Sequence, residues 1–241
     1  MNFIASNLLI VKERLRQAAL AAHREPSQIQ LLAVSKTFAT AAIEEALKAG
    51  QRAFGENYVQ EAIEKIRQLA SVRSELEWHF IGPLQSNKTR EVAEYFDWVH
   101  SVDRLKIAER LSTQRAEFTN LNKLQVCVQL NISEEVSKSG ISPTEAEALC
   151  IEIAKLPHLT LRGLMAIPAP SPDPQTQRHT FAQVQNCFED IKRRHLGQLG
   201  FEYFDTLSMG MSDDMEAAIA EGSTIVRIGS AIFGKRDKIK S

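Results

Sequence analysis

The fold is decided first by residues 31–37, which read LLAVSKT. This short, β-rich run is typical of the first strand of an α/β sheet. A dinucleotide-binding fold carries a glycine-rich turn, Gly-x-Gly-x-x-Gly, directly after that strand. The stretch contains no glycine. A doubly wound open sheet is therefore the weaker of two α/β alternatives, and a barrel is the stronger one.

Outward from this stretch, β-rich runs alternate with longer segments of helical periodicity. We expect strands at 29–36, 51–55, 76–82, 97–101, 123–131, 159–167, 204–209 and 224–229. We expect helices near 40–49, 57–70, 86–95, 103–117, 142–155, 175–197 and 212–221. Such alternation implies a parallel sheet, and eight units in 241 residues are enough to close a barrel. The predicted fold is one (β/α)8 TIM-type barrel domain over residues 1–241, with an extra N-terminal helix near 3–23.

The composition excludes several classes of protein. With 44% hydrophobic and 24% charged residues and a net charge of −1, the chain has a sizeable core and no field that attracts nucleic acid or an anionic membrane. It has no apolar run of transmembrane length and no secretory signal. Cys127, Cys150 and Cys187 are widely spaced, like buried thiols in a reducing compartment. We expect a cytoplasmic protein without a metal site.

Side-chain parity places two cationic residues inside the predicted barrel. Residues of one parity point inward, and the carboxyl ends of the strands form the active face. Lys36 shares parity with Leu32 and Val34, and a buried neutral amine can attack an aldehyde to form a Schiff base. Arg227 shares parity with Ile225 in the eighth strand. The alternatives are a strand-end lysine that reaches solvent and an arginine in a structural ion pair.

A phosphate-binding turn is predicted after the eighth strand. Gly229 lets the backbone approach a ligand closely, Ser230 adds a hydroxyl donor, and residues 231–234 resemble a short helical turn. Barrels often bind phosphate at this position. The seventh strand ends in Ser208 and Met209 beside the turn, and we assign both to the ligand site. We interpret Ser212 as the N-cap of the following helix.

Four further residues have a structural alternative beside the functional one. Asn57, in the loop 55–58, is either an N-cap or a ligand-side donor. His79 has inward parity and is either a core histidine or a ligand-facing one. Met165 lies at the barrel mouth, where a thioether packs on an aromatic ring or fills core. Lys138, in a polar loop, is either a second amine near the site or a solvated side chain.

Six runs of sequence carry a resemblance to a known family. They are VSKT at 34–37, GENY at 55–58, WHFIGPLQSNK at 78–88, GLM at 163–165, SMGMSDD at 208–214 and VRIGS at 226–230. Together they closely resemble the YggS/PROSC family of pyridoxal 5′-phosphate (PLP) homeostasis proteins, over about residues 8–236. The two long runs are highly specific, whereas VSKT alone is a weak signal.

The resemblance implies a barrel similar to the N-terminal domain of alanine racemase, with PLP held covalently on Lys36. It implies that Arg227 faces the pyridine nitrogen, which stays unprotonated because arginine donates and keeps its charge. It also implies that Ser208, Gly229 and Ser230 hold the phosphate. Many members of the family continue Ser-Lys-Thr with a basic residue and proline. This chain has Phe-Ala at 38–39, which weakens the case for a second amine there.

The expected function follows from a group that the sequence lacks. A PLP racemase needs a second acid or base opposite the lysine, which two-domain alanine racemases take from a C-terminal β-domain of a partner subunit. This chain has room for the cofactor barrel alone. We therefore expect a monomeric, non-catalytic PLP-binding protein that stores, buffers or transfers PLP, with PLP-dependent apo-enzymes as partners. The alternatives are a fold-type III amino-acid racemase and a phosphosugar lyase with a Schiff-base lysine.

Overall fold

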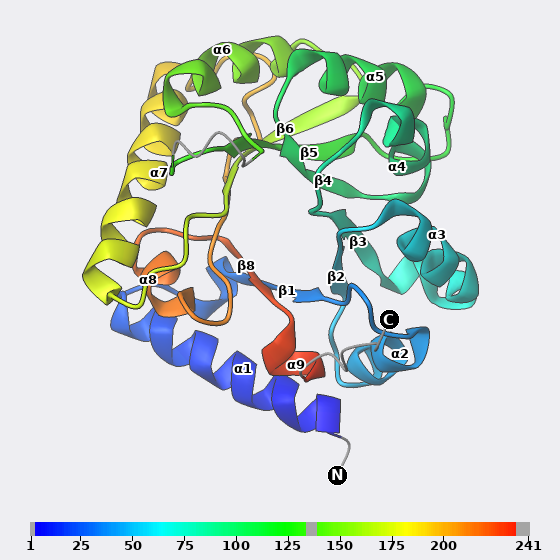
Figure 1. Cartoon of the computed structure of the whole chain (residues 1–241). Helices are drawn as coiled ribbons and strands as arrows, with labels where there is room; N and C mark the ends of the chain where they lie inside the picture. The colour runs from blue at the N-terminus through cyan, green and yellow to red at the C-terminus, as the bar shows by residue number, and fades with distance from the viewer. Residues whose placement is uncertain (1–2, 134–138, 235–241) are drawn as a thin grey trace.

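The computed structural model describes residues 3–133 and 139–234. These residues form a closed barrel of eight strands in sequence order, each paired in parallel with the next, and β8 with β1 (Figure 1). The strands are β1 (Gln30–Val34), β2 (Ala53–Glu56), β3 (Glu77–Phe80), β4 (Trp98–Val102), β5 (Leu124–Leu130), β6 (Leu159–Ala166), β7 (Thr206–Ser208) and β8 (Ile225–Ile228). The predicted TIM-type barrel is confirmed, and the open sheet is excluded.

Helices form the outer layer of the barrel. They are α1 (Phe3–Ala21), α2 (Thr40–Lys48), α3 (Val59–Gln68), α4 (Thr89–Tyr95), α5 (Leu105–Arg115), α6 (Pro143–Ala154), α7 (Pro174–Arg194), α8 (Met215–Ala220) and α9 (Ser230–Phe233). Short 3₁₀ turns span Pro26–Gln28, Ala70–Glu75 and Ser86–Lys88. The expected extra helix is α1, which lies along α8, α9 and α2 (Figure 1). None of the helices described is long and apolar enough to span a membrane.

Side-chain hydrogen bonds to backbone amides precede the first residues of α7 and α8. Asp173 accepts hydrogen bonds from the amides of Gln175 and Thr176, so α7 starts at Pro174, a residue suited to the first helical position. The predicted N-cap at Ser212 is wrong. Residues 212–214 form a turn in which Asp214 Oδ1 accepts from the Met211 amide, and α8 begins only at Met215. A local turn satisfies this carboxylate before the helix starts.

Two apolar clusters divide the core. The larger one lies between strands and helices, and the smaller one fills the barrel interior. We refer to the latter as the interior cluster, which comprises Leu32, Val34, Ala53, Ile81, Trp98, Cys127, Met165 and Ile225. Because successive residues of a strand face opposite sides, residues two apart from these members also point inward. The inward parity predicted for Lys36, His79 and Arg227 follows from this cluster.

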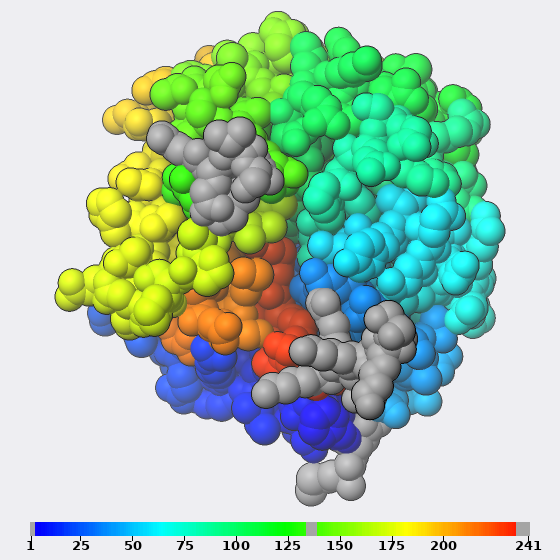
Figure 2. Space-filling view, viewed as in Figure 1, coloured from blue at the N-terminus to red at the C-terminus, as the bar shows by residue number. Residues whose placement is uncertain are grey.

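One end of the barrel gathers the carboxyl ends of the strands. In Figure 1 the viewer looks onto this end, where β8 runs into α9. Figure 2 shows the same face in space-filling form, with the red segment of β8 and α9 reaching the centre of the ring of helices. The residues singled out at strand ends in the sequence therefore converge on this face.

Candidate functional site

A buried arginine lies in the barrel interior near its carboxyl end. Arg227 is 4% exposed, and its Nη1 and Nη2 donate to Ser208 Oγ at 2.8 Å and to the Ala166 carbonyl at 2.9 Å. Burial lowers the pKa of Arg227 to about 10, so the guanidinium is charged at neutral pH. Both acceptors are uncharged, which speaks against the structural ion pair considered as an alternative. A buried cation with neutral partners suits a site for an electron-rich ligand.

Lys36 follows β1 on the strand next to β8, and its side chain is half-buried. Strand pairing matches Ala33 with Ile228, so Lys36 lies beyond the end of β1 beside the turn that begins at Gly229. A Cβ on Gly229 would come within 3.3 Å of the Val34 carbonyl oxygen, so the two strand ends approach closely. The predicted anchor and the predicted phosphate turn are therefore neighbours across one strand pair.

The peptide preceding Lys36 is held by a buried ion pair. Lys65 of α3 donates from Nζ to the Ser35 carbonyl at 2.8 Å and to Glu56 Oε1 at 2.7 Å. Ser35 Oγ donates to the same carboxylate oxygen at 2.6 Å. Burial raises the pKa of Glu56, while the charge of Lys65 and its hydrogen bond oppose the rise. This network fixes the backbone from which the Lys36 side chain departs.

The peptide following Lys36 is held from the same helix. The Thr37 amide donates to Glu61 Oε1, and Lys65 Nζ donates to that oxygen at 2.6 Å. Thr37 adopts φ +68°, which is a strained conformation for a β-branched residue. Strain of this kind persists where surrounding contacts impose it. Residues on both sides of Lys36 are thus tied to Lys65 and its two carboxylates, a network that local sequence patterns did not reveal.

Asn57 carries a buried hydrogen-bond acceptor that has no donor. Its Oδ1 has no hydrogen-bond partner, and the N-cap position of α3 is occupied by Tyr58. The N-cap alternative for Asn57 is therefore wrong. The backbone of Asn57 passes so close to Gly82 that a Cβ there would lie 2.2 Å from the Asn57 carbonyl oxygen. A buried, unpaired amide oxygen at the carboxyl end of β2 is available to a ligand.

The two methionines assigned to the site lie in different layers. Met165 belongs to the interior cluster and is paired in register with Ser208. Met209 is fully buried, but its side chain belongs to the outer cluster between strands and helices. The reason is strand alternation, because Ser208 points inward and its neighbour must point outward. The backbone of Met209 is engaged as well, because its amide donates to the Ile225 carbonyl and its carbonyl accepts from Ser223 Oγ.

The phosphate turn has the predicted local structure. Gly229 precedes the short helix α9, and its carbonyl accepts from the amides of Ile232 and Phe233 at 2.9 and 3.0 Å. Ser230 is exposed at the first position of that helix. Ser208 lies buried on the neighbouring strand β7. Gly229 and Ser230 are adjacent in this turn, whereas Ser208 is paired in register with Ile225, and the role of the three residues in binding phosphate stays a prediction.

His79 belongs to a polar chain that the sequence patterns did not reveal. His79 Nδ1 lies 2.8 Å from His100 Nε2, and His100 Nδ1 lies 2.7 Å from Ser208 Oγ. Both histidines are fully buried. His79 therefore reaches the site through His100 and is not a merely apolar core residue. The available signal was parity, because His100 is two residues beyond the inward-facing Trp98.

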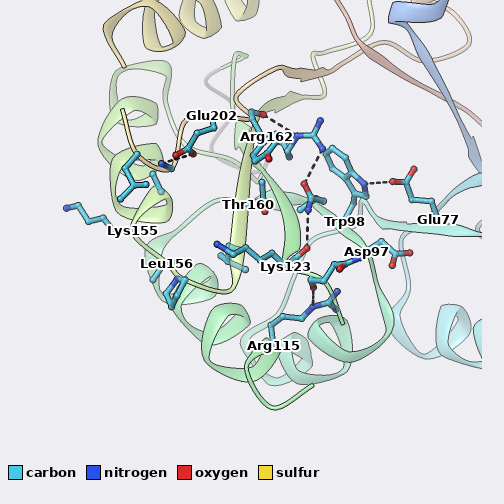
Figure 3. Close-up of a pocket in the computed structure, with 18 of the residues that line it drawn as sticks. Glu77, Asp97, Trp98, Arg115, Lys123, Lys155, Leu156, Thr160, Arg162 and Glu202 are labelled. Carbon is cyan, nitrogen blue, oxygen red and sulfur yellow. Dashed lines mark hydrogen bonds between the residues drawn. The ribbon is translucent and has the colours of Figure 1, made fainter. Parts of the chain in front are cut away.

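A pocket of about 1060 Å³ lies at the opposite end of the barrel (Figure 3). Its walls include Glu77 and Trp98, which begin β3 and β4, and Arg162 of β6. Arg162 lies over the Trp98 ring, 4.6 Å from its centroid, and is paired with Asp205. The Arg162 cation of this pocket is thus already paired with a carboxylate. Lys138 lies outside the described residues.

Comparisons with known proteins agree with this architecture. The family model described as alanine racemase, N-terminal domain, matches residues 7–237. A protein of Escherichia coli strain K12 named pyridoxal phosphate homeostasis protein is 54% identical over 241 residues, covering 100% of both chains. One of Pseudomonas aeruginosa with the same name is 54% identical over 237 residues, covering 98% of this chain and 97% of its own.

Two solved structures place the fold among its relatives. PipY of Synechococcus elongatus, solved with PLP bound, has a TM-score of 0.79 and 38% identity, covering 96% of this chain and 100% of its own. Alanine racemase of Corynebacterium glutamicum has a TM-score of 0.65 at 17% identity, covering 97% of this chain and 61% of its own, which is a likeness of fold alone. The chain therefore belongs to the alanine racemase N-terminal domain family, together with the pyridoxal phosphate homeostasis proteins.

Proposed function

We propose that this chain binds PLP at the carboxyl end of its barrel and serves PLP homeostasis by storing, buffering or handing over the cofactor. The observation that carries the proposal is the buried Arg227, whose two hydrogen bonds go to the neutral oxygens of Ser208 on β7 and Ala166 on β6. PLP offers a ring nitrogen that accepts and a phosphate that is anionic, and both compensate a buried cation. The PLP-bound structure of the 38% identical PipY supports the choice of ligand.

The residues present fit this cofactor. The Lys36 amine would bond to the aldehyde carbon, and Arg227 would donate to the pyridine nitrogen. Ser208, Gly229 and Ser230 would hold the phosphate, with Met165 against the ring and the unpaired Asn57 oxygen as an acceptor. When bound, PLP supplies an electron-withdrawing ring. An arginine at the ring nitrogen leaves it unprotonated, which makes the ring a poorer electron sink.

A non-catalytic role is part of the proposal. It is supported by the name of the relatives, which describes homeostasis, and by Arg227 as the partner of the ring nitrogen. The proposal includes a cytoplasmic monomer that passes PLP to apo-enzymes. Cys127, Cys150 and Cys187 are free thiols, in keeping with a reducing compartment. Burial raises the pKa of Cys127 to about 12, which keeps this thiol protonated and unreactive.

Absorbance spectroscopy tests the proposal. The purified protein with added PLP should show a visible band that borohydride abolishes, and mass spectrometry should place the reduced adduct on Lys36. Lys36→Ala should lack the band, while Lys155→Ala should keep it, because Lys155 is exposed and its amine pairs with Glu152 on the surface. Timed incubation with a PLP-dependent apo-enzyme should then restore that enzyme's activity.

Two outcomes would contradict the proposal. The first is a wild-type protein without a visible band at saturating PLP, which would remove the cofactor itself. The second is racemisation of an amino acid at ordinary enzymatic rates that Lys36→Ala abolishes, which would make the protein a catalyst.

A further inference from the structure

Four polar side chains form a continuous chain along the barrel axis, which we call the axial relay: Glu77, His79, His100 and Ser208. Glu77 Oε2 lies 3.1 Å from His79 Nε2, an ion-pair distance without hydrogen-bond alignment. The next two contacts measure 2.8 Å between the histidines and 2.7 Å from His100 to Ser208. Both histidines are fully buried, whereas 37% of the Glu77 side chain is exposed in the pocket of Figure 3. The relay links solvent at one end of the barrel to the ligand site at the other.

The partners of Ser208 fix the direction of the hydrogen bonds. Arg227 donates to Ser208 Oγ, because a guanidinium has donors alone. Ser208 is fully buried, and of its two side-chain partners only His100 Nδ1 is able to accept a hydrogen bond. A buried hydroxyl proton without an acceptor costs free energy, so Ser208 donates to His100 Nδ1. A neutral imidazole that accepts at Nδ1 carries its proton at Nε2, so His100 donates to His79 Nδ1. By the same reasoning His79 carries its proton at Nε2, facing the Glu77 carboxylate.

Electrostatics agree with these protonation states. Burial, together with the charge of Arg227, lowers the pKa of His100 well below its ordinary value, so His100 is neutral. For Glu77, burial favours the acid form, but the contact with His79 and the hydrogen bonds from Gln30 and Trp98 outweigh it and lower the pKa to about 2. Trp98 Nε1 donates to Glu77 Oε1 at 2.7 Å (Figure 3). The relay thus ends on a fixed anion.

A bound phosphate competes for the Ser208 proton. Phosphate dianion oxygens are acceptors alone, so the hydroxyl can contact them only by donating. The hydroxyl has a single proton, so a Ser208 that donates to phosphate no longer donates to His100 Nδ1. To keep its contact with Ser208, His100 must donate from Nδ1 and accept at Nε2. His79 must then donate from Nδ1 while its Nε2 proton stays beside the Glu77 carboxylate.

This reversal changes the proton count by one. His79 with a proton on each nitrogen is an imidazolium, whereas His100 remains neutral and has only exchanged one tautomer for the other. The additional proton comes from solvent, through the exposed carboxylate of Glu77. No bond between heavy atoms forms or breaks. The proton offsets half of the charge that a phosphate dianion brings to the barrel interior.

We propose that a phosphate group bound at Ser208 reverses the axial relay and loads one proton onto His79, so that PLP binds together with a proton. Glu77, His79 and His100 are then positioning residues, since they act on the cofactor through Ser208. The inference rests on the proposed function, because it takes Ser208 as a ligand of the PLP phosphate.

The surroundings of His79 suit an imidazolium. The Trp98 ring stacks on His79, with centroids 5.3 Å apart and planes 12° apart, and aromatic faces attract cations. The Arg162 cation, 4.6 Å from the same ring centroid, is neutralised by Asp205. Arg227, which donates to Ser208, is the charged group at the far end of the relay among the residues that the structure describes. Cys127 adds no charge in the barrel interior, because burial keeps its thiol protonated.

Nitrogen-15 NMR of the histidine rings tests the inference directly. The chain has six histidines, and those of the relay are assigned by comparison with His79→Gln and His100→Gln. Without ligand, both should be neutral with the proton on Nε2. With PLP, His79 should carry two ring protons and His100 should carry its proton on Nδ1. Pyridoxal, which lacks the phosphate, should leave both rings unchanged, and the exposed His179 serves as an internal reference.

Calorimetry gives a second readout that needs no variant. Titrations of the wild type at pH 8 in buffers of different ionisation enthalpy count the protons taken up, and free PLP phosphate is already dianionic there. PLP should take up about one proton more than pyridoxal. Glu77→Gln should lose this difference, because the anion that stabilises the imidazolium is gone. A visible band with equal proton counts for PLP and pyridoxal would overturn the relay and leave PLP binding intact. The absence of any band would overturn both.

Discussion

The guanidinium of Arg227 in β8 donates from Nη1 to the hydroxyl of Ser208 in the neighbouring strand β7, over 2.8 Å. The two residues are both buried in the barrel interior. This pair couples a fixed positive charge to the one hydroxyl that ends the axial relay. It therefore connects the ligand site to the barrel core and to the pocket at the opposite end.

Arg227→Met should stabilise the PLP-free protein and weaken PLP binding. Burial lowers the pKa of Arg227 from 12.5 to about 10, so the folded state holds this proton less tightly than the unfolded state. The resulting loss of folding stability is fully present at every pH below about 10, including neutral pH, and it diminishes only above that pH. Removing the buried charge should raise the free energy of unfolding. We expect this gain to be limited to about 1–2 kcal/mol, because the Ala166 oxygen loses its donor.

Urea denaturation and PLP titration of the same samples check this prediction. Arg227→Lys is the matched control, because it keeps the charge but cannot donate to both Ser208 and Ala166. We expect Arg227→Lys to be less stable than Arg227→Met. A loss of stability in Arg227→Met would mean that the arginine holds the empty barrel together.

Glu77→Gln should flatten the acid limb of the stability curve. The folded-state pKa of Glu77 is lowered from 4.5 to about 2, so its contribution is present above about pH 4.5 and is lost as the pH falls towards 2. Wild type should therefore lose more stability than the variant between these values. Equilibrium urea unfolding at pH 5, 4 and 3 measures the difference.

Glu13 in α1 provides the comparison for Glu77. Its pKa is also lowered to about 2, by hydrogen bonds from Arg16 and Gln17, but its side chain is 55% exposed. Solvent screens an exposed pair, so Glu13→Gln should leave the acid limb close to that of wild type. Equal effects of the two substitutions would show that the interior position of Glu77 carries no special weight.

Lys65→Met should destabilise the fold strongly because it leaves a buried carboxylate without its cation. Lys65 and Glu56 are 7% and 0% exposed in their side chains. Removing one partner of such a pair costs about 3–5 kcal/mol. The double variant Lys65→Met/Glu56→Gln should recover part of the loss. A thermodynamic cycle over the four proteins, measured by urea unfolding, gives the coupling, and purely additive losses would contradict it.

Gly163→Ala should prevent β6 and β7 from pairing. Gly163 has φ +149°, and a Cβ there would lie 1.9 Å from the Thr206 carbonyl oxygen of the neighbouring strand. Backbone must move to relieve this overlap, and we expect a loss of about 3 kcal/mol or more. Gly197 is the matched control. It has φ +76° and nothing within 4 Å of its added Cβ, so Gly197→Ala should cost only the conformational strain of about 1–2 kcal/mol. Thermal unfolding of both variants makes the comparison.

The sequence by itself determined the barrel and the inward set of side chains. Both depend on short-range periodicity, because alternation of strands and helices and a period of two within a strand can be read locally. Lys36, Ser208 and Arg227 face inward for this reason. Met209, one residue beyond Ser208, faces the outer cluster for the same reason. Ser212 and Asn57 were harder to predict, because the choice between a cap and a turn depends on a few competing hydrogen bonds.

Tertiary structure alone decided which inward residues meet. His100 and Ser208 are 108 positions apart and lie within 2.7 Å, and Lys65 reaches Ser35 from a helix outside the barrel. Such contacts depend on strand register and stagger, which pair His79 with Trp98 and Met165 with Ser208. Register is set by the closure of the whole barrel, since each strand must satisfy both neighbours at once. The sequence therefore singled out His79 and Ser208 as candidate site residues, and only the folded barrel joined them to Glu77 and His100 in a relay.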